Sequence, residues 1–116
     1  MHLNLPRLQY LDVEYTQENV CTIRLNRPQK RNAFTPLMIS ELAFVLRWAQ
    51  EEASVWMVKL EANGPVFCAG MDLLVFENPS LDIENEAIPR VSMSLAAVMR
   101  LCHKPIVCLL EGNVYA

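Results

Sequence analysis

The sequence contains no apolar run near the length of about 18 residues that a helix needs to cross a bilayer. Its N-terminus also lacks the basic segment, the apolar segment and the small-residue cleavage site of a secretory signal peptide. Basic residues number 10 against 13 acidic ones and cluster only at Arg27, Lys30 and Arg31, whereas nucleic-acid binding needs a basic stripe. We therefore expect a cytoplasmic protein with no membrane and no nucleic acid among its partners.

No C-x-x-C pair joins the four cysteines, which argues against both a zinc site and a disulfide framework. Cys21, Cys68, Cys102 and Cys108 all lie in apolar surroundings, so we expect four reduced thiols in the core. Free buried thiols are typical of a reducing compartment. No metal site is predicted.

The chain has 116 residues, of which 53% are apolar and 20% charged. This length allows one domain, and this balance is typical of a packed core. Residues 1–9 precede the first periodic segment and are expected to form a flexible N-terminal segment.

The first half predicts a hairpin and a helix. Residues 10–15 and 20–25 alternate between apolar and polar side chains on either side of a polar four-residue turn, which predicts two paired strands. Proline at position 28 ends the second strand. Thr35-Pro36 then has the pattern of an N-cap followed by a proline at the first helical position, and apolar residues at helical spacing continue to about Glu52.

The second half predicts a βαβ series. Residues 55–62 and 106–110 read as buried strands, the first covered on both faces, with a helix over 91–102 between them. Residues 78–89 contain two prolines and several charges and are expected to form a mobile surface loop. The order predicts an α/β fold with a parallel sheet. Because the last strand ends six residues before the C-terminus, we expect an incomplete fold.

Three segments in fixed order resemble the crotonase (enoyl-CoA hydratase/isomerase) family. Residues 25–34 read LNRPQKRNAF, residues 66–73 read VFCAGMDL, and residues 104–112 read KPIVCLLEG. Family members read L-N-R-P-x-x-x-N-A, F-x-A-G-x-D-L and K-P-x-I-A-x-x-x-G in this order. The resemblance implies the ClpP/crotonase fold, a spiral of ββα units. The chain from Tyr10 onward would be its N-terminal half.

The resemblance also implies acyl-CoA thioester binding and, in the complete parent protein, enoyl-CoA hydratase or isomerase chemistry. Such enzymes stabilise an enolate-like oxyanion with two backbone N–H groups, which is effective because the donors are already in place when charge develops. By position in the motif, the N–H of Met71 would be the first donor, and Gly70 would let the backbone turn sharply. Coenzyme A would enter as part of the substrate, with no separate cofactor.

The first two segments would also contact coenzyme A. Lys30 and Arg31 would supply charge to its phosphates, with a plain solvated loop as the alternative, and Asn32 and Ala33 would act through turn geometry. Asp72 is expected in the first turn of a short helix, where negative charge is favourable. The implied contact set is Lys30, Arg31, Asn32, Ala33, Ala69, Gly70, Met71, Asp72 and Leu73.

The sequence also departs from the family. The second donor comes from a glycine-rich segment just after the glycine matched by Gly112, and the acid/base glutamates lie further on; residues 1–116 contain neither. Glu111 replaces a commoner asparagine or aspartate and is expected to be a solvated or structural residue. The chain alone is therefore expected to be inactive, and the full-length protein a homo-oligomer. A non-catalytic crotonase-fold binding or assembly module remains the alternative.

Overall fold

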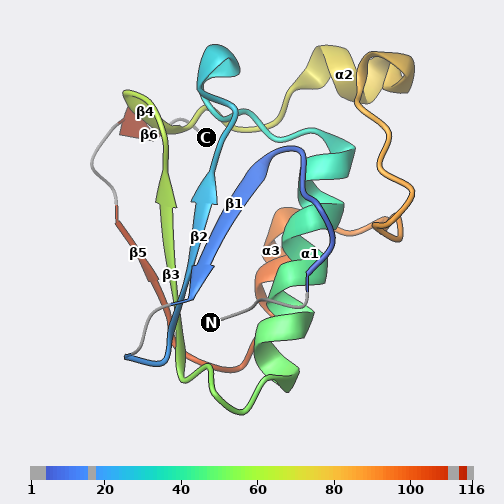
Figure 1. Ribbon diagram of the computed structural model, residues 1–116. Coiled ribbons are helices and arrows are strands. Elements are labelled where there is room, and N and C mark those ends of the chain that lie inside the picture. Colours follow the sequence, from blue (N-terminus) through green and yellow to red (C-terminus); the bar gives the residue numbers. More distant parts are fainter. Residues whose placement is uncertain (1–4, 16–17, 110–112, 115–116) are drawn as a thin grey trace.

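A four-stranded sheet forms the centre of the protein (Figure 1). The computed structural model describes residues 5–15, 18–109 and 113–114. Strands β1 (Leu11–Tyr15), β2 (Val20–Leu25), β3 (Met57–Ala62) and β5 (Ile106–Cys108) lie in the order β1-β2-β3-β5. The β1–β2 pair is antiparallel and the other two pairs are parallel, which confirms the predicted hairpin and parallel sheet. Strands β4 (Val66–Cys68) and β6 (Asn113–Val114) form a separate parallel pair.

Two helices pack on one face of this sheet (Figure 1). Helix α1 (Pro36–Glu51) begins as predicted, because the Thr35 hydroxyl accepts a hydrogen bond from the Met38 N–H at 3.1 Å. Helix α3 (Leu95–Met99) is much shorter than the predicted 91–102, since Ser94 caps its start through the Ala97 N–H. No helix in the described part of the chain is long and apolar enough to span a membrane.

The core lies between α1 and the sheet. Alternate side chains of β2 and β3 meet the apolar stripe of α1 and are almost fully buried. These groups include Ile23, Leu25, Val58, Leu42, Val45 and Leu46.

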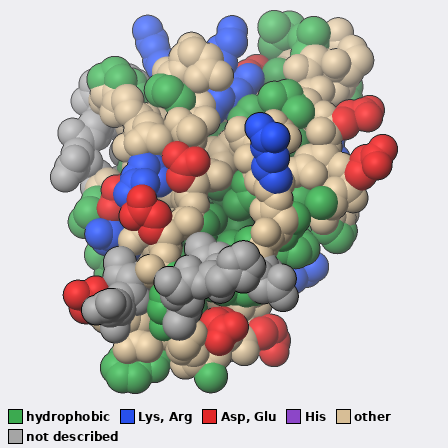
Figure 2. Space-filling view, viewed as in Figure 1, with side chains coloured by type: hydrophobic (Ala, Val, Ile, Leu, Met, Phe, Trp, Pro, Cys, Tyr) green, Lys and Arg blue, Asp and Glu red, His purple; other side chains and the backbone are tan. Residues whose placement is uncertain are grey.

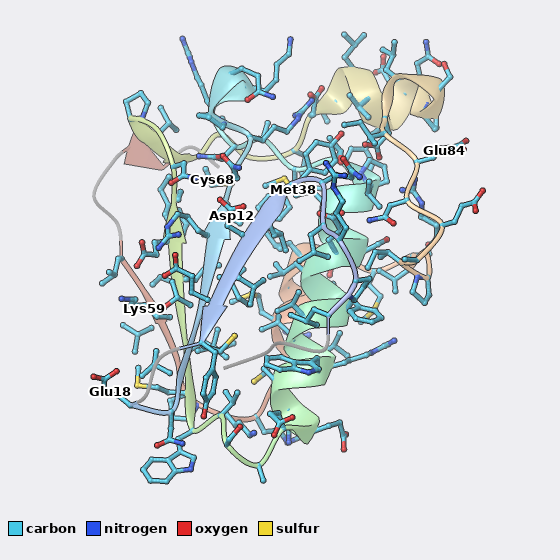
Figure 3. The ribbon with its side chains drawn as sticks, in the orientation of Figure 1. Asp12, Glu18, Met38, Lys59, Cys68 and Glu84 are labelled. Atoms are coloured by element: carbon cyan, nitrogen blue, oxygen red, sulfur yellow. The ribbon has the colours of Figure 1, made fainter. Side chains whose placement is uncertain are left out.

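Two predictions of burial are wrong. Strand β3 is covered on one face only, because Lys59 and Glu61 alternate with its apolar residues and form an ion pair of 3.2 Å on the other face (Figure 3). Strand β5 pairs only with β3 among the described residues, which leaves Val107 and Cys108 exposed at the sheet edge. Three of the four cysteines are therefore buried, not all four.

The segment between β4 and α3 covers the N-terminal end of α1. It contains helix α2 (Leu73–Glu77) and the short 3-10 helix η2 (Pro79–Leu81). Most of residues 78–89 are exposed, as expected of a surface loop, but Asp82 and Ile88 anchor them. The Asp82 carboxylate accepts hydrogen bonds from the Tyr10 hydroxyl and the Leu37 N–H, both at 2.9 Å.

Glu41 is a fully buried carboxylate on α1 that the sequence analysis did not identify. It accepts hydrogen bonds from the backbone N–H groups of Gln9 and Tyr10 at 2.7 and 2.8 Å, which ties the entry to β1 onto the helix. Burial raises its pKa, and the hydrogen bonds from Gln9, Tyr10 and Asn85 offset this only in part.

Asn32 holds the loop between β2 and α1 in place. Its backbone is left-handed, with φ at 56°, a conformation that asparagine tolerates better than most residues. The side-chain Oδ1 accepts from the Arg27 N–H at 2.8 Å, while Nδ2 donates to the carbonyls of Asn63 and Val66 at 2.7 and 2.8 Å. One buried amide thus joins this loop to the turn between β3 and β4.

Arg27 extends the same network to α2. Its Nη1 donates to the Ala33 carbonyl at 2.9 Å and to Asp72 Oδ2 at 2.8 Å, and its guanidinium lies 5.6 Å from the centre of the Tyr10 ring. Asp72 also accepts from the Val75 N–H and so caps α2. Burial alone would raise the pKa of Asp72, but the hydrogen bonds from Arg27 and Val75 outweigh it and lower the pKa.

The raised pKa of Glu41 predicts a distinctive pH dependence for Glu41→Gln. A group whose pKa is higher in the folded state stabilises most below its ordinary value of 4.5 and loses that contribution as pH rises through the folded value. Between pH 4 and pH 7 the unsubstituted protein should therefore lose stability relative to Glu41→Gln. The loss should be about 1.4 kcal/mol for each unit by which folding raises the pKa of Glu41. Urea unfolding at each pH measures it, with Glu51→Gln as the exposed control on the same helix. Parallel pH curves for the two proteins would contradict the assignment.

The buried Arg27–Asp72 pair predicts non-additive mutations. Arg27→Met leaves the Asp72 carboxylate without its cation and should destabilise the protein by about 3–5 kcal/mol. Asp72→Asn keeps an N-cap acceptor, and adding it to Arg27→Met should recover part of that loss. Urea unfolding of both single variants and the double variant measures the coupling, and strictly additive losses would refute a direct interaction.

Because the pKa of Asp72 is lowered, its stabilisation is present above about pH 3.8 and is lost as pH falls through the folded value.

Candidate functional site

The chain turns sharply at Gly70, directly after β4. The φ of Gly70 is 94°, a conformation that favours glycine. Its carbonyl accepts from the Phe34 N–H at 2.8 Å, and the Asp72 N–H donates to the Phe34 carbonyl at 2.9 Å. The segment after the turn is thus paired in parallel with the loop that precedes α1, centred on Phe34 and Met71.

This pairing determines where the Met71 N–H points. In an extended segment, the backbone groups of alternate residues face opposite sides. Since the Gly70 carbonyl and the Asp72 N–H both face Phe34, the N–H of Met71 faces away from it. It makes no hydrogen bond to any other described residue. The turn therefore presents one backbone donor that the fold itself does not use.

An apolar cavity of about 390 Å³ lies beside this turn. Gly70 and Met71 form part of its wall, and no lining side chain carries oxygen or nitrogen. The Cys68 Sγ supports the turn, accepting from the Gly70 N–H at 3.4 Å. Figure 3 shows Cys68 at the end of β4, where the chain leaves toward α2. The remaining walls come from the central sheet, β4, the loop before α1, α1 and α3: Leu25, Leu60, Cys108, Phe67, Phe34, Leu42, Leu95 and Met99.

The basic loop lies next to the same turn. Lys30, at the end of the short 3-10 helix η1 (Pro28–Lys30), and Arg31 are both exposed. The Arg31 carbonyl accepts from the Ala69 N–H at 3.0 Å, which fixes this loop against the residue before Gly70. Lys and Arg side chains project from this end of the molecule in Figure 2.

The other candidate residues have structural positions. Asn32 and Ala33 are buried in the loop network, and Leu73 is exposed at the start of α2. Asp72 lies one position before the predicted first turn of that helix, as its N-cap. Glu111 and Gly112 lie outside the described residues.

Sequence reasoning missed the role of Arg27. In the sequence Arg27 belongs to the basic cluster with Lys30 and Arg31, yet its side chain is almost fully buried, whereas theirs are exposed. Its neighbours in sequence, Asn26 and Pro28, carry no signal that separates a buried arginine from a solvated one. No group of His, Cys, Asp or Glu that could hold a metal ion occurs among the described residues.

Comparisons with known proteins identify the family of this chain. The family model described as enoyl-CoA hydratase/isomerase matches residues 15–116. A crystal structure of an enoyl-CoA hydratase from Mycobacterium marinum is 25% identical, with a TM-score of 0.70 over 88% of this chain and 48% of that one. An enoyl-CoA hydratase/isomerase from Pseudoalteromonas atlantica is 30% identical, with a TM-score of 0.69 over 88% of this chain and 39% of that one. An enoyl-CoA hydratase from Mycobacterium tuberculosis is also 30% identical, with a TM-score of 0.66 over 90% and 40%.

The chain spans less than half the length of each of these three structures. The shared part has the mixed α/β architecture of the crotonase fold. With the family model matching most of its residues, the chain belongs to the enoyl-CoA hydratase/isomerase (crotonase) family.

Proposed function

We propose that this chain binds acyl-CoA thioesters at the Gly70–Met71 turn and places the acyl chain in the adjoining cavity. The observation that carries the proposal is a backbone N–H without a partner among the described residues, on a residue that also lines an apolar cavity of about 390 Å³. Recognition of a thioester needs both features, a donor for the carbonyl oxygen and an apolar volume for the hydrocarbon.

The same donor suits the chemistry of the family. When the α-carbon loses a proton, or the β-carbon is attacked, negative charge gathers on the thioester oxygen. A fixed N–H lowers the barrier because it is already oriented when that charge develops. Met71 would provide this N–H, and the φ of 94° at Gly70 orients it.

The polar end of the substrate would lie against the basic loop. Lys30 and Arg31 are exposed and fixed beside the turn through the Arg31–Ala69 hydrogen bond. Their charges would attract the phosphates of coenzyme A by charge-assisted hydrogen bonds. No cofactor beyond the coenzyme A of the substrate is part of this proposal.

Residues 1–116 would supply half of the catalytic site. We propose that a longer protein containing them carries the second donor and the acid/base residues, runs hydratase or isomerase chemistry, forms a homo-oligomer and is cytoplasmic. The isolated chain would then bind acyl-CoA without turning it over.

A pair of substitutions at Met71 in the longer protein tests the donor. Met71→Ala keeps the N–H and should retain most of the rate while changing acyl-chain selectivity. Met71→Pro removes the N–H and should lower kcat by about 10²–10³, the loss measured for one oxyanion donor elsewhere. Rates of enoyl-CoA hydration and isomerisation measure both variants.

Circular dichroism and Tm serve as the controls, because proline also restricts the backbone. If a folded Met71→Pro variant turned over as fast as Met71→Ala, the N–H would have no catalytic role. Tight acyl-CoA binding with no turnover by the longer protein would instead favour a non-catalytic binding module.

The basic loop makes a second prediction, which concerns binding. Replacing Lys30 and Arg31 together by Gln should weaken the binding of a saturated acyl-CoA roughly tenfold at low salt, since each exposed charge contact contributes about 0.2–1 kcal/mol. The matching acyl-pantetheine lacks the nucleotide phosphates, so it should bind the unsubstituted protein and the double variant with equal affinity. Arg47→Gln with Arg100→Gln, at two exposed positions elsewhere, is the control. Calorimetric titration measures each Kd. If the double substitution weakened the binding of acyl-pantetheine equally, Lys30 and Arg31 would not contact the phosphates.

A further inference from the structure

Two of the four cysteines share the cavity beside Gly70. Cys68, at the end of β4, and Cys108, at the end of β5, both line it, whereas Cys21 and Cys102 are buried away from its wall. The wall of this cavity has no side-chain oxygen or nitrogen, and its reactive groups are two thiols beside the weakly nucleophilic thioethers of Met71 and Met99.

The two thiols differ in what they contact. The Cys68 Sγ is buried and engaged with the turn, accepting from the Gly70 N–H at 3.4 Å and lying 3.9 Å from the Gly70 carbonyl. Cys108 is exposed at the sheet edge, and its Sγ makes no hydrogen bond within the described part of the chain. Cys108 is thus the thiol that a molecule entering the cavity can reach without displacing a backbone contact.

Selectivity at this thiol would come from the cavity and not from its acidity. Burial of its inner side raises the pKa of Cys108, so little thiolate is present at neutral pH and reaction with any electrophile from bulk water is slow. An apolar molecule held in the cavity stays near the sulfur and reacts at a much higher effective concentration.

We propose that Cys108 is a covalent modification site for apolar α,β-unsaturated carbonyl compounds that enter this cavity. The sulfur adds to the β-carbon, so that an S–C bond forms and the alkene π pair moves to the carbonyl oxygen as an enolate. The thiol proton ends on the α-carbon, and the product is a saturated thioether adduct. The addition needs no oxidant, reductant or further reactant.

The proposal uses the same cavity as the proposed function, and one step rests on that function. The enolate oxygen formed during addition would accept the hydrogen bond that the Met71 N–H offers. The preference for apolar compounds requires only the cavity and the Cys108 thiol, so it does not depend on the proposed function.

Two compounds with the same reactive vinyl ketone group but different chain lengths test the proposal on the 116-residue chain. Oct-1-en-3-one carries four more methylene groups than but-3-en-2-one, and both are first calibrated against free cysteine. Each methylene that enters the cavity should raise the labelling rate by up to about fourfold. We expect octenone to label Cys108 more than tenfold faster than butenone after calibration. Intact-mass and peptide-mass spectrometry measure the rate and the position.

Two variants define the controls. Cys108→Ser should abolish the fast, chain-length-dependent labelling, whereas Cys102→Ser, at a buried thiol outside the cavity wall, should retain it, with circular dichroism confirming that each variant is folded. Equal calibrated rates for the two ketones, or preferred labelling at Cys68, Cys21 or Cys102, would refute the proposal. Acyl-CoA binding by the unmodified protein is measured in parallel. If it binds while Cys108 stays unlabelled, only the modification site is wrong, and if Cys108 is labelled without acyl-CoA binding, only the proposed function fails.

Discussion

The polar network of Arg27 and Asn32 is the constraint on which the candidate site depends. The Asn32 amide joins the loop after β2 to the β3–β4 turn, and Arg27 joins it to the N-cap of α2. The Gly70 turn lies between these two anchors, which hold it where its hydrogen bonds with Phe34 can set the direction of the Met71 N–H. Hydrophobic burial holds α1 on the sheet, but it does not select the direction of a single N–H. That direction follows from hydrogen bonds of fixed geometry.

The two buried carboxylates show how differently the fold treats negative charge. Asp72 faces the Arg27 guanidinium, and its pKa is lowered although burial works in the opposite direction. Glu41 meets only neutral donors, the N–H groups of Gln9 and Tyr10 and the Asn85 amide, and its pKa is raised. A cation compensates for lost hydration where dipolar donors do so only in part. The first carboxylate positions the candidate site, and the second attaches the entry to β1 to the helix.

Much of the fold followed from local patterns. The alternation in residues 20–25 and the Thr35-Pro36 cap report on their own neighbourhoods, and the structure confirms both. The errors arose where burial depends on distant partners. Periodicity could not show that Lys59 and Glu61 pair on an open face of β3, nor that β5 is an edge strand in the described sheet. Arg27 was missed because a buried arginine and a solvated one look alike until their partners, 6 and 45 residues away, are known. Glu41 had a weak signal, since it lies three residues after Met38 on the buried stripe.

The sequence separation of these contacts also bears on the order in which the chain can assemble. The β1–β2 hairpin and α1 use neighbours close in sequence, whereas the Asn32–Val66 and Arg27–Asp72 contacts close loops of 34 and 45 residues. Contacts that close long loops carry their entropic cost before they gain stability, so they form after the local elements. Docking of β3 beside β2 closes a loop of similar length, so the Met71 N–H acquires its direction only with the long-range part of the structure. The hairpin and the helix by themselves would have nothing that could hold a thioester oxygen.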